Sequence, residues 1–326
     1  MKLIVTIDTE EDDWGSYQRT GSTLQNIEKI PHLQELFDEY NVKPTYLITY
    51  PVAMDRRAVS ILKRILDNGK CEIGAHCHPW NTPPFDEENN EVNSMLCNIS
   101  AGLQYKKLLT LHEAIIQRFG IEPKSFRAGR WGYNETVAEN LYRLDYKVDT
   151  SISPFCDWSE SYGPDFTLTY PDPYRIQFHN HLESYPKRNM IEIPASVGFL
   201  QKNFPLCNRI LNKLRSKNLR HFHIIGMLYR LKLLNLVWLS PEISNGQEMI
   251  SLCKTFMKIG YEYLNMSFHS TSLLIGKSPF AKDESRLSSF YEDIKSVLTF
   301  ATSKNMCFTS LLEAGEIFDK SITENN

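Results

Sequence analysis

The sequence predicts an α/β protein whose parallel strands form a barrel or a doubly wound sheet. Short runs rich in β-branched and aromatic residues alternate with helix-length amphipathic segments about eight times along the 326 residues. Polar side chains suited to metal binding or acid–base chemistry follow several of these apolar runs. Neither GxGxxG nor GxxxxGK occurs, and no glycine-rich loop follows the first strand, which disfavours a nucleotide-binding sheet.

The expected elements follow from apolar periodicity and from glycine stop signals. In the first helix, Ile30, Leu33 and Phe37 share one face, and Gly69 and Gly120 end two later helices. Strands are expected at residues 2–8, 44–50, 71–76, 124–129, 146–152, 190–199, 236–242, 263–270 and 305–313. Helices are expected at residues 27–40, 55–68, 94–119, 134–144, 208–219, 246–259 and 284–304. We interpret residues 1–320 as one domain and residues 321–326 as a frayed tail.

Composition excludes several classes of protein. The apolar fraction of 42% is sufficient for a large core, and a net charge of −3 gives no electrostatic reason to expect a nucleic-acid partner. The N-terminal apolar run is too short for a signal peptide and acidic residues follow it directly, so we expect a cytoplasmic location. Seven scattered cysteines without a CxxC motif predict reduced thiols.

One segment has an unusual charge balance. Residues 193–241 contain no Asp or Glu but eight Lys or Arg, interleaved with bulky apolar residues, and we expect a helical excursion at about residues 200–236. In one interpretation the excursion packs on the barrel and presents a solvated basic face. In the other it forms a peripheral contact with an anionic membrane surface or an anionic glycolipid.

Candidate functional side chains stand at the carboxyl ends of predicted strands, and in a parallel barrel these ends meet on one face. They are Asp8, Glu10, His76, His78, Arg127, Arg130, Asp149 and His269. Residues two apart in an extended segment project to the same side. The two histidines of the "HCH" stretch can therefore join a carboxylate from the first strand in a zinc-type site. The alternative is a pair of histidines that serves a turn or a helix cap.

An open metal site predicts hydrolysis of an amide or ester, because the metal acidifies water and polarises a carbonyl. Such a reaction needs a base, for which Asp8 is the candidate, and an acid, for which His269 is the candidate. Arg127 would keep Asp8 ionised, and Asp149 would raise the pKa of His269. The alternative for Arg127 and Asp149 is a structural ion pair at the barrel rim.

Five segments, in this order, resemble the motifs of the NodB-like polysaccharide deacetylases of carbohydrate esterase family 4. They are "TIDTEED" at 6–12, "GAHCHPW" at 74–80, "FRAGRWG" at 126–132, "VDTSISP" at 148–154 and "MSFHS" at 266–270. The resemblance implies a distorted (β/α)7 barrel, a divalent metal and removal of acetyl from an N-acetylated sugar. It also implies that Asp8 is the base, Glu10 and His76 are metal ligands, Arg127 holds the base, and Asp149 holds the general acid His269.

The chain departs from the common pattern of that family at two positions. Glu10 stands where most members have Asp, and Trp80 stands where most have the second metal histidine, which leaves His78 as the candidate. We expect Zn²⁺, or else Co²⁺, Mn²⁺ or Ni²⁺. The "HCHPW" form, with "WLSPE" at 238–242, resembles the subgroup associated with bacterial surface-polysaccharide and O-antigen biosynthesis.

A cleft suited to a sugar is expected around these motifs, lined by Trp80, Arg130, Trp131, Tyr133 and Glu242. Aromatic residues are also common in barrel loops, and Glu242 also suits a helix N-terminus. The predicted reaction is N-deacetylation of an amino sugar or of a lipid- or nucleotide-linked glycan. The alternatives are an amidase or deformylase acting on another acylamine, and a glycan-binding relative without catalysis.

Overall fold

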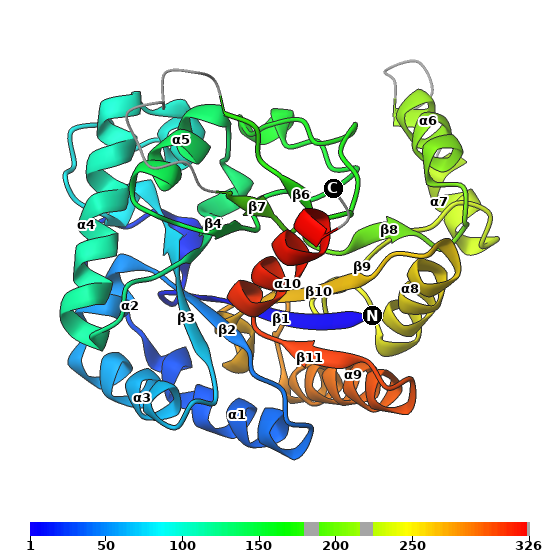
Figure 1. Ribbon diagram of the computed structural model, residues 1–326, viewed down its shortest axis with the longest axis horizontal. Coiled ribbons are helices and arrows are strands. Elements are labelled where there is room, and N and C mark those ends of the chain that lie inside the picture. The colour runs from blue at the N-terminus through cyan, green and yellow to red at the C-terminus, as the bar shows by residue number, and fades with distance from the viewer. Residues whose placement is uncertain (179–188, 216–223, 325–326) are drawn as a thin grey trace.

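The main sheet of the protein is a curled, mostly parallel half-barrel (Figure 1). The computed structural model describes residues 1–178, 189–215 and 224–324. Nine of the strands it describes form this sheet in the order β10–β1–β2–β3–β4–β5–β7–β6, with β11 beside the first residues of β1. Their bounds are β1 Lys2–Thr9, β2 Thr45–Ile48, β3 Glu72–Cys77, β4 Ser125–Ala128, β5 Val148–Asp149, β6 Tyr174–Arg175, β7 Ile191–Glu192, β10 Tyr263–His269 and β11 Cys307–Thr309. All pairs are parallel except β6 with β7.

Single residues, rather than a strand ladder, close the barrel between β7 and β10. The Ser196 N–H donates to the Asn265 carbonyl (3.1 Å), and the Ser267 N–H donates to the Leu239 carbonyl (3.1 Å). The flanking segments β8 (Val197–Phe199) and β9 (Leu236–Trp238) pair antiparallel in a separate two-stranded sheet. The predicted run of parallel strands is therefore interrupted at residues 236–242.

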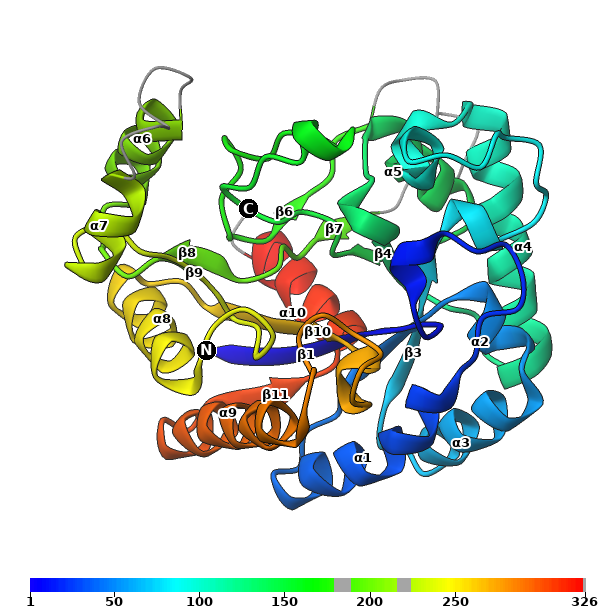
Figure 2. The same ribbon diagram turned by 180° about the vertical axis from the view of Figure 1, so that it is seen from behind.

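Helices cover the outside of the sheet, and one helix packs against its inner face (Figures 1 and 2). The outer helices are α1 Ile30–Glu39, α2 Tyr50–Met54, α3 Arg56–Asp67, α4 Ala101–Phe119, α5 Glu135–Arg143, α8 Gly246–Ile259 and α9 Glu284–Ser303. Helix α10 (Leu311–Glu324) packs Leu311 and Ala314 against Ile4, Leu47 and Val148 of the strands.

Strand alternation separates an apolar outer layer from a polar interior. On β1, the odd-numbered Leu3, Val5 and Ile7 join the large core beneath the outer helices. The even-numbered Thr6 and Asp8 lie on the other side, where both accept hydrogen bonds from Arg127 of β4. The barrel interior therefore becomes polar toward the carboxyl ends of the strands.

Most helix boundaries differ little from the predicted ones, but several strands differ more. The run expected at 190–199 divides into β7 and β8 of separate sheets, and the run expected at 305–313 divides into β11 and the start of α10. Helix α4 begins at Ala101 rather than 94, because residues 92–94 and 96–98 form short 3₁₀ turns. Helix α10 runs to Glu324, so helix covers most of the expected tail, and residues 325–326 lie outside the described residues. The sequence patterns did not predict α2, α10 or β6.

The predicted excursion contains α6 (Phe204–Arg215) and α7 (Ile224–Arg230), which stand out from the barrel (Figures 1 and 2). The helix expected at 208–219 corresponds to α6, and its residues 216–219 lie outside the described residues. Among the helices of the described ranges, none is long and apolar enough to cross a membrane.

Candidate active site

A cavity of about 440 Å³ opens at the carboxyl ends of the strands, within the size range of small-molecule sites. Seven of the polar side chains that line it lie on, or shortly after, strands β1, β3, β9 and β10. Those residues are Asp8, Glu10, His76, His78, Ser240, Glu242 and His269, and the aromatic residues Trp14, Tyr17, Trp131, Trp158, Trp238 and Phe280 form other walls.

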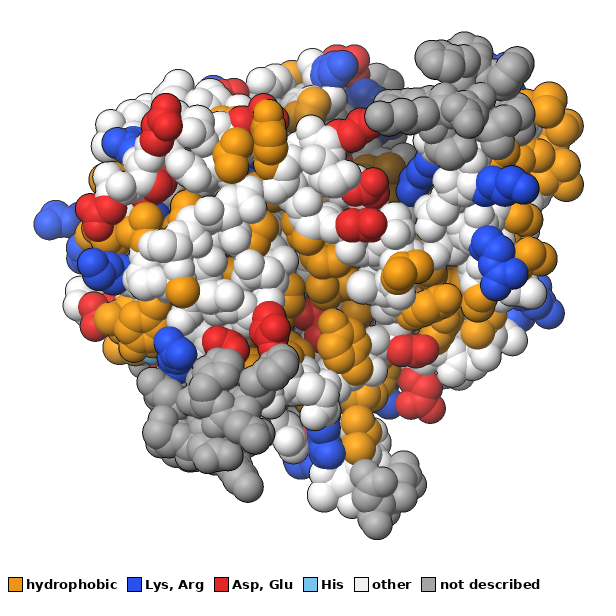
Figure 3. Space-filling model, turned by 90° about the horizontal axis from the view of Figure 1, so that it is seen from above, with side chains coloured by type: hydrophobic (Ala, Val, Ile, Leu, Met, Phe, Trp, Pro, Cys, Tyr) orange, Lys and Arg blue, Asp and Glu red, His pale blue; other side chains and the backbone are white. Residues whose placement is uncertain are grey.

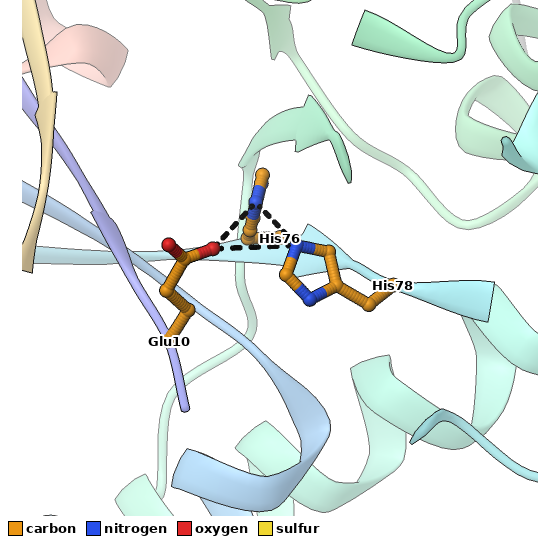
Figure 4. A group of neighbouring side chains, drawn as sticks. All are labelled: Glu10, His76 and His78. Atoms are coloured by element: carbon orange, nitrogen blue, oxygen red, sulfur yellow. Dashed lines mark hydrogen bonds and ion pairs between the residues drawn. The ribbon is translucent and has the colours of Figure 1, made fainter. Parts of the chain in front are cut away.

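Three side chains in this cavity converge as metal ligands do (Figure 4). His76 Nε2 and His78 Nε2 lie 3.0 Å apart, and Glu10 Oε2 lies 3.7 Å from the first and 3.4 Å from the second. Ligand atoms about 2 Å from a tetrahedral ion lie about 3.3 Å from one another. The spacing of these three atoms therefore matches that of ligands to one small cation.

Hydrogen bonds to the other ring nitrogens fix the tautomers of both histidines. His76 Nδ1 donates to the Arg127 carbonyl (3.0 Å), and His78 Nδ1 donates to the Glu11 carboxylate (2.9 Å). Glu11 is itself held by Thr49 (3.1 Å) and Asn81 (2.6 Å). With each proton on Nδ1, both Nε2 lone pairs point at the same place, which is the orientation of metal-bound imidazoles with an outer hydrogen-bond partner.

The electrostatics of this cluster also fit a cation. Burial lowers the pKa of His76 to about 3, so the ring is neutral. Burial, together with the negative charges of Glu11 and Asp8, raises the pKa of Glu10 well above its usual range. Glu10 Oε1 is buried without a hydrogen-bond partner among the described residues. Two facing lone pairs and a buried carboxylate repel one another until a cation neutralises them, so the residues present fit a divalent metal.

The predicted base Asp8 lies beside this cluster and is held by the predicted arginine. Arg127 Nη1 donates to Asp8 Oδ1 (2.6 Å), and the same guanidinium donates to Thr6 Oγ1 (2.7 Å) and to the Thr150 carbonyl (3.0 Å). Burial raises the pKa of Asp8, but the charge and hydrogen bond of Arg127, together with His76 and His269, outweigh burial and hold the pKa at about 2. Asp8 is therefore an ionised carboxylate at neutral pH.

The predicted acid His269 lies on the opposite side of Asp8, and its carboxylate partner differs from the expected one. His269 Nδ1 donates to Glu242 Oε2 (2.9 Å), and Nε2 lies 3.8 Å from Asp8 Oδ2. Burial lowers the pKa of His269, but Glu242, Glu10 and Asp8 together raise it to about 10. The side chain keeps 26% of its surface exposed toward the cavity. His269 is therefore a protonated imidazolium that is accessible from the cavity.

The prediction that Asp149 holds His269 is wrong, and strand register explains why. Asp149 is the register partner of Phe126 on β4, whose side chain belongs to the outer core, whereas the following Thr150 bonds to Arg127 inside the barrel. Asp149 accepts from Ser151 Oγ (2.7 Å) and lies beside Glu192, its partner on β7. Burial raises the pKa of both carboxyls, and the negative charge of Asp149 raises that of Glu192 further.

The expected cleft residues divide into two groups. Arg130, Trp131 and Glu242 line the cavity. Trp80 is 1% exposed and stacks on the His78 ring, with centroids 4.1 Å apart, so it packs against a candidate ligand instead of lining the cavity. Tyr133 is buried outside the cavity lining, where the Asp149 carboxylate and burial raise its pKa.

Sequence reasoning missed two contributions to the site. Glu11 was not singled out, although three consecutive acids in "TEED" were a usable signal. Trp238 reaches the cavity at the end of β9 and approaches the rings of Trp131 (5.7 Å) and Trp158 (6.4 Å). It begins the "WLSPE" segment whose resemblance was noted above, but that resemblance does not indicate that the Trp238 side chain reaches the cavity.

The known proteins found to be similar to this chain are similar in structure, and sequence comparisons found none. No family model matches the sequence, and no curated protein matches it. A solved structure from Mycobacterium smegmatis, provisionally named a polysaccharide deacetylase, is 15% identical with a TM-score of 0.56, over 98% of this chain and 90% of that one. One from Pseudomonas aeruginosa PAO1, named a probable polysaccharide deacetylase, is 12% identical with a TM-score of 0.51, over 97% and 89%.

A third similar structure has a different name. The Puue allantoinase is 10% identical with a TM-score of 0.54, over 97% of this chain and 89% of that one. At these identities the comparisons show the fold, which is the NodB-like deacetylase barrel that the sequence motifs predicted. A fold shared by differently named proteins does not define the substrate, so function has to be argued from the site.

Proposed function

We propose that this chain, which has the NodB-like deacetylase fold, is a metal-dependent hydrolase that removes acetyl from an N-acetylated amino sugar. The observation that carries the proposal is the convergence of His76 Nε2, His78 Nε2 and Glu10 Oε2, beside an ionised carboxylate and a protonated imidazole in one cavity. These are the groups that hydrolysis of an unactivated amide needs.

A divalent metal held by Glu10, His76 and His78, most simply Zn²⁺, would polarise the amide carbonyl and lower the pKa of water. Asp8 takes a proton from the attacking water, for which its pKa of about 2 leaves it ionised. Arg127 fixes the Asp8 carboxylate through Oδ1 and leaves Oδ2 toward the cavity. The oxygen of water forms the new bond to the acyl carbon.

His269 completes the reaction on the other side of Asp8. The bond between the acyl carbon and nitrogen breaks as His269 Nε2 transfers its proton to the departing amine. Glu242 accepts from Nδ1, which orients the ring and favours its protonated form. The products are acetate and a free amino sugar, and the proton taken by Asp8 replaces the one that His269 gave.

Aromatic walls support a sugar as the substrate. Trp131 and Trp158 stack with an interplanar angle of 10°, and Trp238 meets both nearly edge-on. Flat apolar surfaces beside a few convergent polar groups are typical of small-molecule sites and suit the C–H faces of a pyranose. An amidase acting on an acylamine that is not a sugar has less need of three tryptophans.

The proposal extends to bacterial surface-glycan biosynthesis in the cytoplasm, with a nucleotide- or lipid-linked sugar as the intermediate. Its support is the resemblance of "HCHPW" and "WLSPE" to that subgroup. In addition, all seven cysteines are free, as in proteins of a reducing compartment, and five of them are buried: Cys71, Cys77, Cys156, Cys207 and Cys253.

Acetate release tests the proposal. The protein is stripped with a chelator, reloaded separately with Zn²⁺, Co²⁺, Mn²⁺ or Ni²⁺, and supplied with N-acetyl amino sugars, both free and nucleotide-linked. We expect metal-dependent acetate release that Asp8→Asn abolishes while metal content stays unchanged.

The other outcomes identify the alternatives. Formate release from N-formyl sugars would establish a deformylase. Sugar binding without turnover at full metal occupancy would establish a binding protein and overturn the proposal.

A further inference from the structure

We propose that α6, α7 and residues 231–233, all within the predicted excursion, form a docking surface for anionic lipid. This inference goes beyond the proposed function and does not depend on it. Six of the seventeen exposed large apolar side chains in the described residues lie within residues 206–233. They are Leu206, Ile210, Met227, Tyr229, Leu231 and Leu233.

Most of these apolar side chains of the excursion are more exposed than those of the outer helices α4 and α8, where Ile116, Met257 and Ile259 are 37–39% exposed. Leu231 and Leu233 are 60% and 59% exposed, and Met227 is 55% exposed. The outer helices α1, α3 and α9 have no exposed large apolar residue between their bounds. Scattered single leucines on a surface are ordinary, but a concentration on one projecting segment marks an interaction site.

The positive charge of the excursion favours an anionic partner. Five exposed cations of the excursion have no carboxylate partner among the residues that the structure describes: Lys202, Arg209, Lys213, Arg230 and Lys232. Elsewhere in the described residues, ion pairs such as Lys43 with Glu313 (2.7 Å) and Arg57 with Glu28 (2.8 Å) occur alongside other unpaired cations. What distinguishes the excursion is that its cations lie in a segment, residues 193–241, without any Asp or Glu. Unpaired cations beside exposed leucines are complementary to an anionic lipid surface, where headgroups meet the charges and acyl chains meet the apolar side chains.

The surroundings of the excursion agree with this assignment. Residues 193–241 contain no acidic residue that would repel such a surface. The nearest carboxylate contact is that of Glu248 on α8, which accepts from the Tyr229 hydroxyl and thereby holds α7 against the body. In Figure 3, orange and blue side chains gather at the right edge, beside undescribed residues.

The excursion is also connected to the cavity through the chain. It is inserted between β8 and β9, and β9 ends in Trp238, after which Ser240 and Glu242 enter the cavity lining. A membrane contact at the excursion would therefore hold the cavity of the same molecule close to substrates that are anchored in lipid.

Co-sedimentation with vesicles tests the inference. Vesicles of phosphatidylcholine alone are compared with vesicles containing about one third phosphatidylglycerol. We expect wild type to bind the anionic vesicles only, with binding weakened at least tenfold by Leu231→Ser with Leu233→Ser, and by Lys213→Glu with Arg230→Glu. The matched controls, Ile116→Ser with Ile317→Ser and Lys106→Glu with Lys295→Glu, alter exposed residues elsewhere and should bind as wild type does.

Three results would overturn the inference. One is no binding of wild type to anionic vesicles. A second is equal binding by the excursion variants and the controls. The third is self-association of wild type, measured by light scattering, that the leucine variant abolishes, since this would assign the surface to a second copy of the chain. Acetate release from a soluble substrate should be the same in all variants, so failure here is separable from failure of the proposed function.

Discussion

The two sides of the cavity hold histidine in opposite states. At the end of β3, burial lowers the pKa of His76 to about 3, and its Nε2 lone pair faces that of His78. At the end of β10, carboxylates around His269 raise its pKa to about 10, and its Nε2 faces Asp8. The residue type is the same, so the neighbours decide whether an imidazole serves as a metal ligand or as an acid.

Removal of a candidate ligand should abolish metal binding on the His76 and His78 side of the cavity. His78→Ala leaves two of the three ligand atoms, and we expect bound metal to fall from about one ion per chain to near zero. Because the metal is worth several kcal/mol to the transition state, activity should fall about a thousandfold or more. Elemental analysis and acetate release measure the two effects.

The control for this variant is His32→Ala, which removes a side chain that is 72% exposed on α1. It should retain metal and activity. Full metal content in His78→Ala would show that His76 and His78 are not a ligand pair. The contrast between a ligand histidine and an acid histidine would then have no basis.

The second prediction concerns the acid side. Glu242→Gln keeps the shape of the side chain but removes the charge that contributes most to raising the pKa of His269. A lower pKa means that His269 loses its proton at lower pH, so the alkaline limb of the rate profile should move below pH 10. At pH 9 we expect activity to fall about tenfold relative to wild type, with a smaller loss at pH 6.

Asp149→Asn is the matched control, because Asp149 was the partner that the sequence predicted. Its carboxyl lies on the outer side of the sheet and contacts Ser151, so the alkaline limb should stay in place. A shift in Asp149→Asn equal to that in Glu242→Gln would show that the two carboxylates cannot be assigned by geometry.

Local patterns predicted a parallel sheet, either a barrel or doubly wound, and the resemblance to the NodB-like family selected the barrel. Local patterns also placed the candidate metal ligands together. Alternation on β1 and β3 places Asp8 with Glu10, and His76 with His78, on one side, and these positions are close in sequence. The partner of His269 depends instead on register across the sheet and on the chain after β9. A shift of one residue on β5 exchanges Asp149 for Thr150 inside the barrel, and no local pattern fixes that choice.

The same limit applies to the elements that the sequence missed. The two-residue strand β6 exists only through its antiparallel pairing with β7, and α10 is defined by apolar contacts with Ile4 and Leu47 at the far end of the barrel. Glu242 was recognised as a cavity residue, but its role emerged only from its contact with His269.

The prediction with the smallest expected effect on activity tests the comparison most directly. Glu11 and Glu242 each accept a hydrogen bond from an imidazole Nδ1 at 2.9 Å, yet only one of these imidazoles is a ligand candidate. If Glu11 acts by orienting His78 toward the metal, Glu11→Gln should weaken metal affinity about 10- to 100-fold while activity at saturating metal stays near that of wild type. Titration of the stripped protein with Zn²⁺ measures the affinity.

Asp13→Asn, which changes an exposed carboxylate paired with Lys277, is the matched control and should leave metal affinity unchanged. Unchanged affinity in Glu11→Gln would mean that packing by Trp80 alone orients His78. A loss in Glu11→Gln, set beside the pH shift in Glu242→Gln, would show that similar carboxylate contacts have different consequences. The difference would then come from what each Nε2 faces, a second lone pair in His78 and the carboxylate of Asp8 in His269.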